Sequence, residues 1–155
     1  SNIAYYLERT SHGSTLSRVV HSWVLSRSDR SGSWKLFSEA LKSDIEDTQG
    51  GTTPEGIHLG AMAGTVDLIT RCYTEMKVRD HVLHFNPCLP EELGRLHMHI
   101  RFRGHYLEVD VFPDKLRVYS LPCEEAPVQI GLNGKVYEFK GDDTKDLPFK
   151  HSGES

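Results

Sequence analysis

The spacing of apolar and polar positions divides the chain into two halves. From residue 14 to residue 74 the apolar residues recur every three or four positions, which is the period of an amphipathic α-helix. From about Val78 onward they recur at every second position, which is the period of a β-strand with one buried face. Because helices are followed by strands without alternation, the pattern predicts an α+β protein of two units, with the boundary between Tyr73 and Val82.

Three helices are predicted in the first half. The first begins at Ser14 or Thr15, whose hydroxyl can accept from a first-turn amide, and it ends at the polar run 28–32. The second extends from about Ser33 to Asp47, and the third from roughly Gly56 to Tyr73. The third is apolar on most faces, so it is expected to be buried against other helices. Three helices make a thin core, and we expect them to belong to a larger helical assembly.

Two pairs of residues on these helices have structural interpretations. Trp23 and Trp34 lie on the apolar sides and are interpreted as core residues rather than as platforms for sugar rings. Gly60 and Gly64 are four positions apart, a spacing that allows close packing of helices in the core of a water-soluble protein. We prefer that interpretation to a membrane dimer.

The second half begins with a clear hairpin. A two-residue turn at Arg103-Gly104 would set Met98 opposite Val109 and His97 opposite Asp110. One face of the pair is then apolar, and the other face sets basic residues opposite acidic ones, which favours cross-strand pairing. We therefore expect two antiparallel strands here.

A second hairpin and a further short strand complete the pattern. Asn133-Gly134 is a strong signal for a two-residue turn, and it would pair Ile130 with Tyr137 and Val128 with Phe139. A strand is also expected at 116–121. Several short strands with regular turns predict a small antiparallel sandwich, whereas the polar segment from Gly141 onward is expected to be disordered.

Composition and charge narrow the class of protein. The net charge is -4 and no Lys/Arg stripe is present, so a nucleic-acid partner is not expected. No apolar run approaches the roughly 18 residues of a membrane span, and no signal-peptide pattern opens the chain, so neither is expected. Cys72, Cys88 and Cys123 lack metal-ligand spacing, so we expect reduced thiols and a cytoplasmic protein. The chain begins Ser1-Asn2 without a Met, which we interpret as the start of a cut fragment.

Four segments resemble one family of enzymes. Residues 10–17, TSHGSTLS, and residues 55–64, EGIHLGAMAG, resemble two late motifs of the maltose, trehalose and kojibiose phosphorylases of glycoside hydrolase family 65. Residues 85–90, FNPCLP, resemble the entry into the C-terminal sheet domain of these enzymes, and residues 100–109, IRFRGHYLEV, resemble the strand pair that follows. The resemblance covers roughly residues 4–140, with the motifs in the same order and spacing.

The resemblance implies a fold and a reaction. Residues 1–77 would be the C-terminal helices of an (α/α)6-barrel catalytic domain, 78–141 a jelly-roll-like β-sandwich, and 142–155 a flexible polar tail. The family cleaves an α-glucoside with inorganic phosphate and inversion at the anomeric carbon, releasing β-glucose 1-phosphate. The general acid is a Glu on an earlier barrel loop, so no catalytic residue is expected in this chain, which alone would be inactive. No cofactor is expected, and a homodimer could cover the helical part.

The two late motifs also imply a phosphate site. His12, Gly13, Ser14 and Thr15 precede one helix and His58 precedes another, so backbone amides, hydroxyls, imidazoles and two helix dipoles could face one dianion. On the residues alone, an ordinary capped helix explains 12–15, and a hydrogen-bonded structural histidine explains His58. The resemblance favours the phosphate interpretation.

Two further groups of residues have competing interpretations. Glu55 could be the base of a water-using hydrolase, but we prefer a first-turn carboxylate that stabilises its helix, since phosphate needs no base. His97 and His99, with His105 and Glu108 nearby, could suggest a cupin-type metal site. The Glu spacing does not fit that pattern, so we prefer a charge-paired surface and no metal. The alternatives to a phosphorylase are thus a family 65-type hydrolase and a non-catalytic sandwich whose helices dock a partner.

Overall fold

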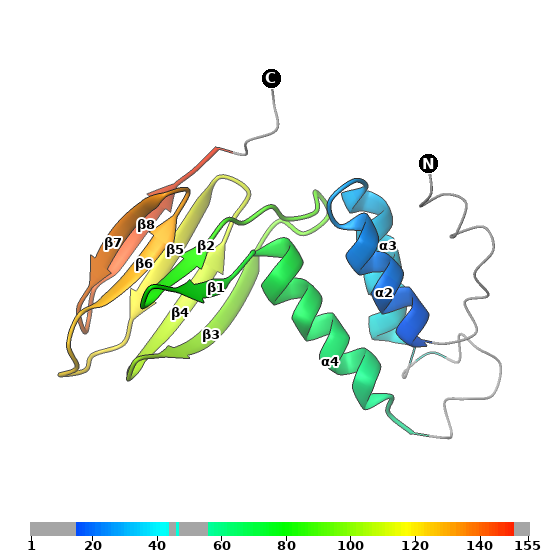
Figure 1. The fold of residues 1–155 in the computed structure, drawn as a ribbon, viewed down its shortest axis with the longest axis horizontal. Helices are drawn as coiled ribbons and strands as arrows, with labels where there is room; N and C mark the ends of the chain where they lie inside the picture. Colours follow the sequence, from blue (N-terminus) through cyan, green and yellow to red (C-terminus); the bar gives the residue numbers. More distant parts are fainter. Residues whose placement is uncertain (1–14, 44–45, 47–55, 151–155) are drawn as a thin grey trace. The chain divides into compact units, whose positions relative to one another are not determined.

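A computed structural model describes residues 15–43, 46 and 56–150, and its two compact units meet between Tyr73 and Thr74 (Figure 1). Three helices make up the described part of the first unit, and two mainly antiparallel sheets make up the second. The predicted α+β class is therefore confirmed at this level. The junction lies at the first residue of the boundary region predicted from the sequence.

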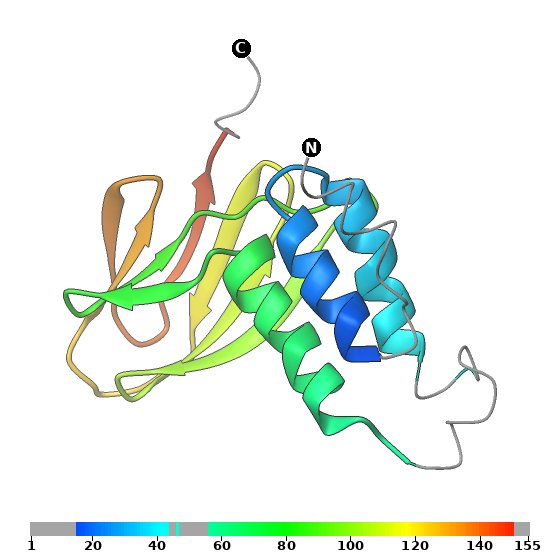
Figure 2. The ribbon, with the colours of Figure 1, turned by 45° about the vertical axis from the view of Figure 1, so that its right-hand side comes forward.

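The helical unit contains α2 (Thr15–Leu25), α3 (Arg30–Lys42) and α4 (Leu59–Leu68), and α4 continues into a π-helical turn, η2 (Ile69–Tyr73). The three helices lie side by side in both views (Figures 1 and 2). The prediction of three helices is confirmed within the described residues. Ser14, one of the two predicted caps of the first helix, lies outside them.

The start of α3 differs from the sequence-based expectation. The helix begins at Arg30, three residues before the predicted Ser33, because the Asp29 carboxylate accepts a hydrogen bond from the Gly32 amide at 2.8 Å. A side-chain oxygen at this position satisfies a first-turn amide that would otherwise lack a partner. The polar run 28–32 therefore supplies the cap and first turn of the helix as well as the link before it.

A buried polar network joins α2, α3 and η2. The Ser22 hydroxyl donates to the Ser33 carbonyl oxygen at 2.7 Å, and the Ser33 hydroxyl lies 3.1 Å from the Tyr73 hydroxyl. Burial raises the pKa of Tyr73, so this phenol stays protonated over the physiological range. The Phe37 ring stacks on Trp34 at 5.3 Å and meets the edge of Tyr73 at 5.7 Å. Tyr73 of η2 therefore packs against the core of the helical unit through its contacts with α3.

The third helix packs closely on α2 through a glycine. A methyl group on Gly64 would lie 2.5 Å from Val19 Cγ1, whereas one on Gly60 would meet nothing within 4 Å. The close-packing interpretation therefore holds for Gly64 alone. The outward face of α2 is apolar and exposed: Trp23 is 54% exposed. The expectation that Trp23 is a core residue is wrong for this chain, because its side chain lines an open groove between α2 and α4.

The second unit is a sandwich of two four-stranded sheets (Figure 1). The strands of the first sheet, in spatial order, are β1 (Lys77–Arg79), β2 (Val82–Phe85), β6 (Val128–Leu132) and β7 (Lys135–Phe139). Those of the second are β3 (Leu96–Phe102), β4 (His105–Val111), β5 (Lys115–Ser120) and β8 (Thr144–Pro148). Only β2 and β6 pair in parallel; the other described pairs are antiparallel.

Both hairpins predicted from the sequence are confirmed in register. In the β3–β4 pair, Met98 lies opposite Val109 and His97 opposite Asp110. In the β6–β7 pair, Val128 lies opposite Phe139. The alternating apolar residues of β4, β5 and β6 are almost completely buried, so the core of the sandwich lies between its sheets.

The β1–β2 hairpin carried no sequence signal. Its turn residues, Asp80 and His81, have φ of +49° and +66°. That conformation is the one in which two-residue hairpin turns usually place Asn or Gly. Because neither residue is present, the pattern did not indicate a turn.

The predicted flexible tail at 142–155 is wrong for most of its length. Residues Thr144–Pro148 form β8, which pairs antiparallel with β5. Leu147 and Phe149 are only 4% and 9% exposed, so the segment contributes to the core. Thr144 and Asp146 on the outward face of β8 are polar, so the apolar pattern did not indicate a strand. Asp146 accepts a hydrogen bond from Arg117 Nε at 2.6 Å. Residues 151–155 lie outside the described part.

Candidate functional site

His58 stands at the N-terminus of α4. Its backbone has φ −80° and ψ 82°, and its carbonyl oxygen accepts from the amides of Ala61 and Met62 at 2.9 and 3.1 Å. The His58 side chain makes no capping hydrogen bond to the helix, and no acidic residue occupies the first turn. The positive end of the helix dipole is therefore not offset by a carboxylate within that turn.

Thr15 is the first residue of α2, whose first turn also lacks an acidic residue. His12, Gly13 and Ser14, together with the Thr15 side chain and Glu55, lie outside the described residues. The structure therefore locates two elements of the predicted phosphate site, the starts of α2 and α4. It gives no contacts for the remaining residues of the site.

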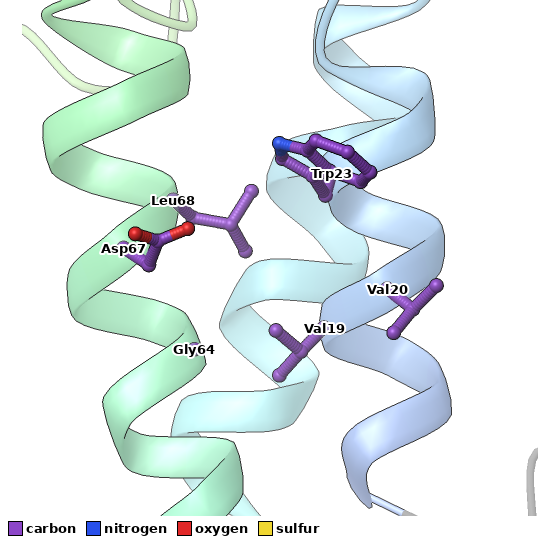
Figure 3. Close-up of a pocket in the computed structure, with 6 residues that line it drawn as sticks. All are labelled: Val19, Val20, Trp23, Gly64, Asp67 and Leu68. Carbon is purple, nitrogen blue, oxygen red and sulfur yellow. The ribbon is translucent and has the colours of Figure 1, made fainter.

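The two helix starts point in the same direction. Val19 contacts Gly64, and one turn further along both helices Trp23 lies at the level of Leu68 (Figure 3). Residue numbers rise together along both helices, so α2 and α4 are parallel. Thr15 precedes Val19 by four residues and Leu59 precedes Gly64 by five. At about 1.5 Å per residue, the two N-termini lie at nearly the same height along the pair.

A shallow groove of about 150 Å³ runs between these helices (Figure 3). It is lined mainly by apolar side chains, with Trp23 at one side. The carboxylate on its rim, Asp67, is held by Arg71 at 2.6 Å. Binding sites for drug-sized ligands usually have volumes of about 300–1,000 Å³ and several converging polar groups, so this groove is smaller and more apolar than such sites.

Arg18 is a cation near the start of α2 that the sequence analysis did not single out. Its side chain is 12% exposed, and its Nε lies 3.4 Å from Glu39 Oε2 of α3. On the α2 pattern alone, an arginine at this position belongs to a solvent-facing side. Its burial follows from the approach of α3, which only the tertiary structure reveals.

The sheet separates His105 from the other residues weighed for a cupin-type metal site. The His105 side chain is completely buried and hydrogen bonds Ser120 Oγ at 2.7 Å and the Ala126 carbonyl at 3.1 Å. His97 and His99 lie on the opposite, outward face of β3. Within the described ranges, no group of three or more His, Cys, Asp or Glu side chains could hold a metal ion. The three cysteines, all in the described part, form no disulfide.

None of the helices in the described part of the chain combines the length and apolar character needed to span a bilayer.

Two family models match the chain, one for each unit. Residues 1–67 match the central catalytic domain of glycosyl hydrolase family 65, and residues 76–139 match its C-terminal domain. The match boundary falls close to the junction of the two structural units.

Individual relatives agree with the family models. A protein of Mycobacterium tuberculosis described as an uncharacterized glycosyl hydrolase is 44% identical over 138 residues, covering 89% of this chain and 10% of the relative. Trehalose 6-phosphate phosphorylase of Lactococcus lactis is 36% identical over 109 residues, covering 70% and 14%. A solved structure assigned as a kojibiose phosphorylase from the human microbiome superposes with a TM-score of 0.75 at 25% identity, covering 95% and 19%.

The chain thus spans between 10% and 19% of the length of these relatives. The matches nevertheless take in both units, in the order catalytic domain and then C-terminal domain. The motif resemblance and the fold similarity lead to the same assignment: the chain belongs to glycosyl hydrolase family 65.

Proposed function

We propose that the chain is the C-terminal part of an inverting disaccharide phosphorylase. The parent enzyme would cleave an α-glucoside of the maltose, trehalose or kojibiose type with inorganic phosphate and release β-glucose 1-phosphate. Several relatives are named as phosphorylases of trehalose 6-phosphate, kojibiose or trehalose, which supports this choice within the family. In this proposal the helical unit is the end of an (α/α)6 barrel.

The observation that carries the proposal is the parallel arrangement of α2 and α4. Their first turns lie at the same end, at nearly the same height, and neither turn contains an acidic residue. Helix N-termini attract anions through unsatisfied amides and the dipole. Two of them side by side would favour a dianion such as phosphate more strongly than one.

In the proposed site, His12, Gly13, Ser14 and Thr15 bind phosphate from the start of α2, and His58 binds it from the start of α4. Gly13 lets the backbone approach the anion, and the hydroxyls and imidazoles donate hydrogen bonds. A phosphate oxygen attacks the anomeric carbon from the face opposite the leaving sugar. The bond to the leaving oxygen breaks as a Glu outside this chain protonates it, so the configuration inverts.

The exposed apolar sides of α2 and α4 support the assignment to a larger helical domain. Val20 and Trp23 of α2 and Leu59 of α4 are 48%, 54% and 77% exposed. Isolated exposed apolar residues are common, but a continuous apolar helix face is typical of an interface. Further barrel helices in the parent protein would cover these faces.

The reaction is tested by assaying the parent enzyme with maltose, trehalose and kojibiose, with and without inorganic phosphate. We expect one of these sugars to yield β-glucose 1-phosphate only when phosphate is present. Release of free glucose at the same rate without phosphate would support the hydrolase alternative, in which Glu55 acts as the base for water. The 155-residue chain alone should have no activity in either assay.

The third alternative, a non-catalytic sandwich with docking helices, makes a different prediction. It requires a parent protein that neither phosphorolyses nor hydrolyses any of the three disaccharides. It also predicts that the helical unit hides its apolar faces by itself, which the exposed fractions of Trp23 and Leu59 do not favour.

A further inference from the structure

The outward face of the β3–β4 hairpin carries a pair of histidines in direct contact. His97 Nε2 and His99 Nε2 are 3.2 Å apart, and the two rings are nearly perpendicular, at 87°. Both residues are exposed, because alternate positions of β3 point away from the core and β3 lies at the edge of its sheet. The contact brings the outer nitrogens of two imidazoles together at the surface.

The protonation of His97 follows from its second contact. Its Nδ1 lies 2.8 Å from Asp110 Oδ1, and a carboxylate can only accept, so His97 Nδ1 donates. Neutral His97 therefore has a lone pair at Nε2, directed toward His99. A metal-bound histidine commonly has this arrangement, with the second ring nitrogen donating to a carboxylate that orients the ring. The contact between His97 and Asp110 thus has the geometry of a histidine that is oriented for binding a metal.

The spacing of the two nitrogens fits a shared metal ion. Two imidazole nitrogens, each about 2.0–2.1 Å from one Zn²⁺ at a tetrahedral angle, lie roughly 3.3–3.4 Å apart. The observed 3.2 Å differs from this by little more than 0.1 Å. Imidazole suits zinc, copper and nickel, whereas Mg²⁺ and Ca²⁺ prefer oxygen ligands.

We propose that His97 and His99 form a surface site for one late first-row divalent ion such as Zn²⁺. The ion binds the Nε2 atoms of both rings, and the proton that His99 carried on Nε2 moves to its Nδ1, so both rings stay neutral. Two protein ligands leave the other positions to water, in agreement with the absence of a third ligand group among the described residues. This site is separate from the proposed phosphate site.

The charges around the pair set limits on its affinity. Glu108 lies directly opposite His99 and favours a cation, whereas Arg95 binds the same oxygen of Asp110 as His97 does, at 2.7 Å. The further charged and titratable groups on this face include Arg101 of β3, Tyr106 of β4, Lys115, Arg117 and Tyr119 of β5, and Asp146 of β8.

The test is a titration of the 155-residue chain with Zn²⁺, followed by long-range nitrogen–proton NMR of the histidine rings. We expect the Nε2 signals of His97 and His99 to shift together at one ion per chain. His97→Ala and His99→Ala should each weaken this binding at least tenfold, and Asp110→Asn by about tenfold. The matched control His81→Gln, an exposed histidine on a turn of the other sheet, should bind as the wild type does.

Because the NMR signals belong to individual histidine rings, zinc bound by the cysteine thiols would not be mistaken for zinc bound by His97 and His99. Unshifted His97 and His99 signals at several-fold molar excess of Zn²⁺ would overturn it. Unchanged affinity at these signals in the Asp110→Asn variant would remove the supporting role of Asp110. Far-UV circular dichroism of each variant distinguishes loss of binding from loss of fold, and His99→Gln provides a second substitution at the same position.

Discussion

In the helical unit, large apolar side chains such as Val20, Trp23 and Leu59 are about half exposed or more. The apolar side chains on the inner faces of the sandwich are almost fully buried. The sandwich closes its own core between two sheets. The described helices cover each other on one side only, around Phe37 and Tyr73. Among the described residues, the sandwich therefore encloses its own core, whereas the helical unit leaves several large apolar side chains exposed.

The two units also contribute differently to the argument about function. The sandwich can be understood from its own residues, and it presents a polar outward face. The helical unit leaves several large apolar side chains exposed, and under the proposed function its chemistry depends on further residues of the parent enzyme. Changes in the core should therefore affect the two units in different ways.

The largest effect is expected in the sandwich. Leu147→Ala should lower the stability of this unit by about 2–5 kcal/mol, because it empties a buried position of β8. Denaturant titration followed by methyl NMR of the β4 and β5 valines measures the loss. The exposed neighbour Thr144→Ala is the control. Equal stability of Leu147→Ala and wild type would mean that β8 is the loose tail predicted from the sequence.

The second prediction tests the packing of α2 on α4. Gly64→Ala should destabilise the helical unit by about 1–3 kcal/mol, since its methyl group would overlap Val19. Gly60→Ala, on the same helix but facing open space, should be neutral or slightly stabilising. Both tryptophans of the chain lie in α2 and α3, so thermal melts followed by tryptophan fluorescence report this unit. Identical melting of both variants would contradict the close contact.

The third prediction concerns the exposed face of α2. Trp23→Gln should change the stability of the chain by less than about 0.5 kcal/mol, because the side chain is exposed. It should, however, reduce self-association in sedimentation velocity experiments at high concentration. Tyr106→Gln removes an equally exposed aromatic residue from the sandwich and should leave association unchanged. If Tyr106→Gln reduced self-association more than Trp23→Gln did, the surface responsible for association would lie on the sandwich.

The smallest effect is expected from the ion pairs on the outer sheet face. Hydrogen bonds from Arg117, and to a lesser extent from Lys115, lower the pKa of Asp146 below its usual range. Desolvation raises this pKa, but its effect is smaller. A carboxyl with a lowered folded-state pKa stabilises the fold above its unfolded pKa, near 3.9, and the benefit is lost as the pH falls further.

Asp146→Asn should therefore lower the urea midpoint slightly at pH 7 and flatten its decline below about pH 4. The pair is solvent-exposed, so the effect is small. Glu124→Gln, at an exposed position in the loop after β5, is the comparison variant. The same acid-side slope in Asp146→Asn and wild type would show that Asp146 has an ordinary pKa.

Local signals in the sequence predicted much of the fold. The Arg103-Gly104 and Asn133-Gly134 turns fixed the register of two hairpins, because turn type and alternation leave only one pairing. The β1–β2 hairpin and β8 were missed for physical reasons. Asp80-His81 adopts a turn that these residues rarely favour, and β8 is polar on its outward side.

Tertiary features of the candidate site were less accessible. The motif around His58 indicated a helix start, and the structure confirms one there. The parallel direction of α2 and α4, the burial of Arg18 and the link from Ser33 to Tyr73 depend on how three helices pack. No periodicity in a single sequence contains that information.

The central claim is that phosphate is held where α2 and α4 begin, and His58 is the described residue that tests it most directly. The measurement is the apparent affinity for inorganic phosphate of the parent enzyme and its His58→Ala variant, with His81→Gln as the control. Loss of one hydrogen bond to a charged group should weaken phosphate binding roughly ten- to a hundredfold in His58→Ala. The same phosphate affinity in all three proteins would contradict the account.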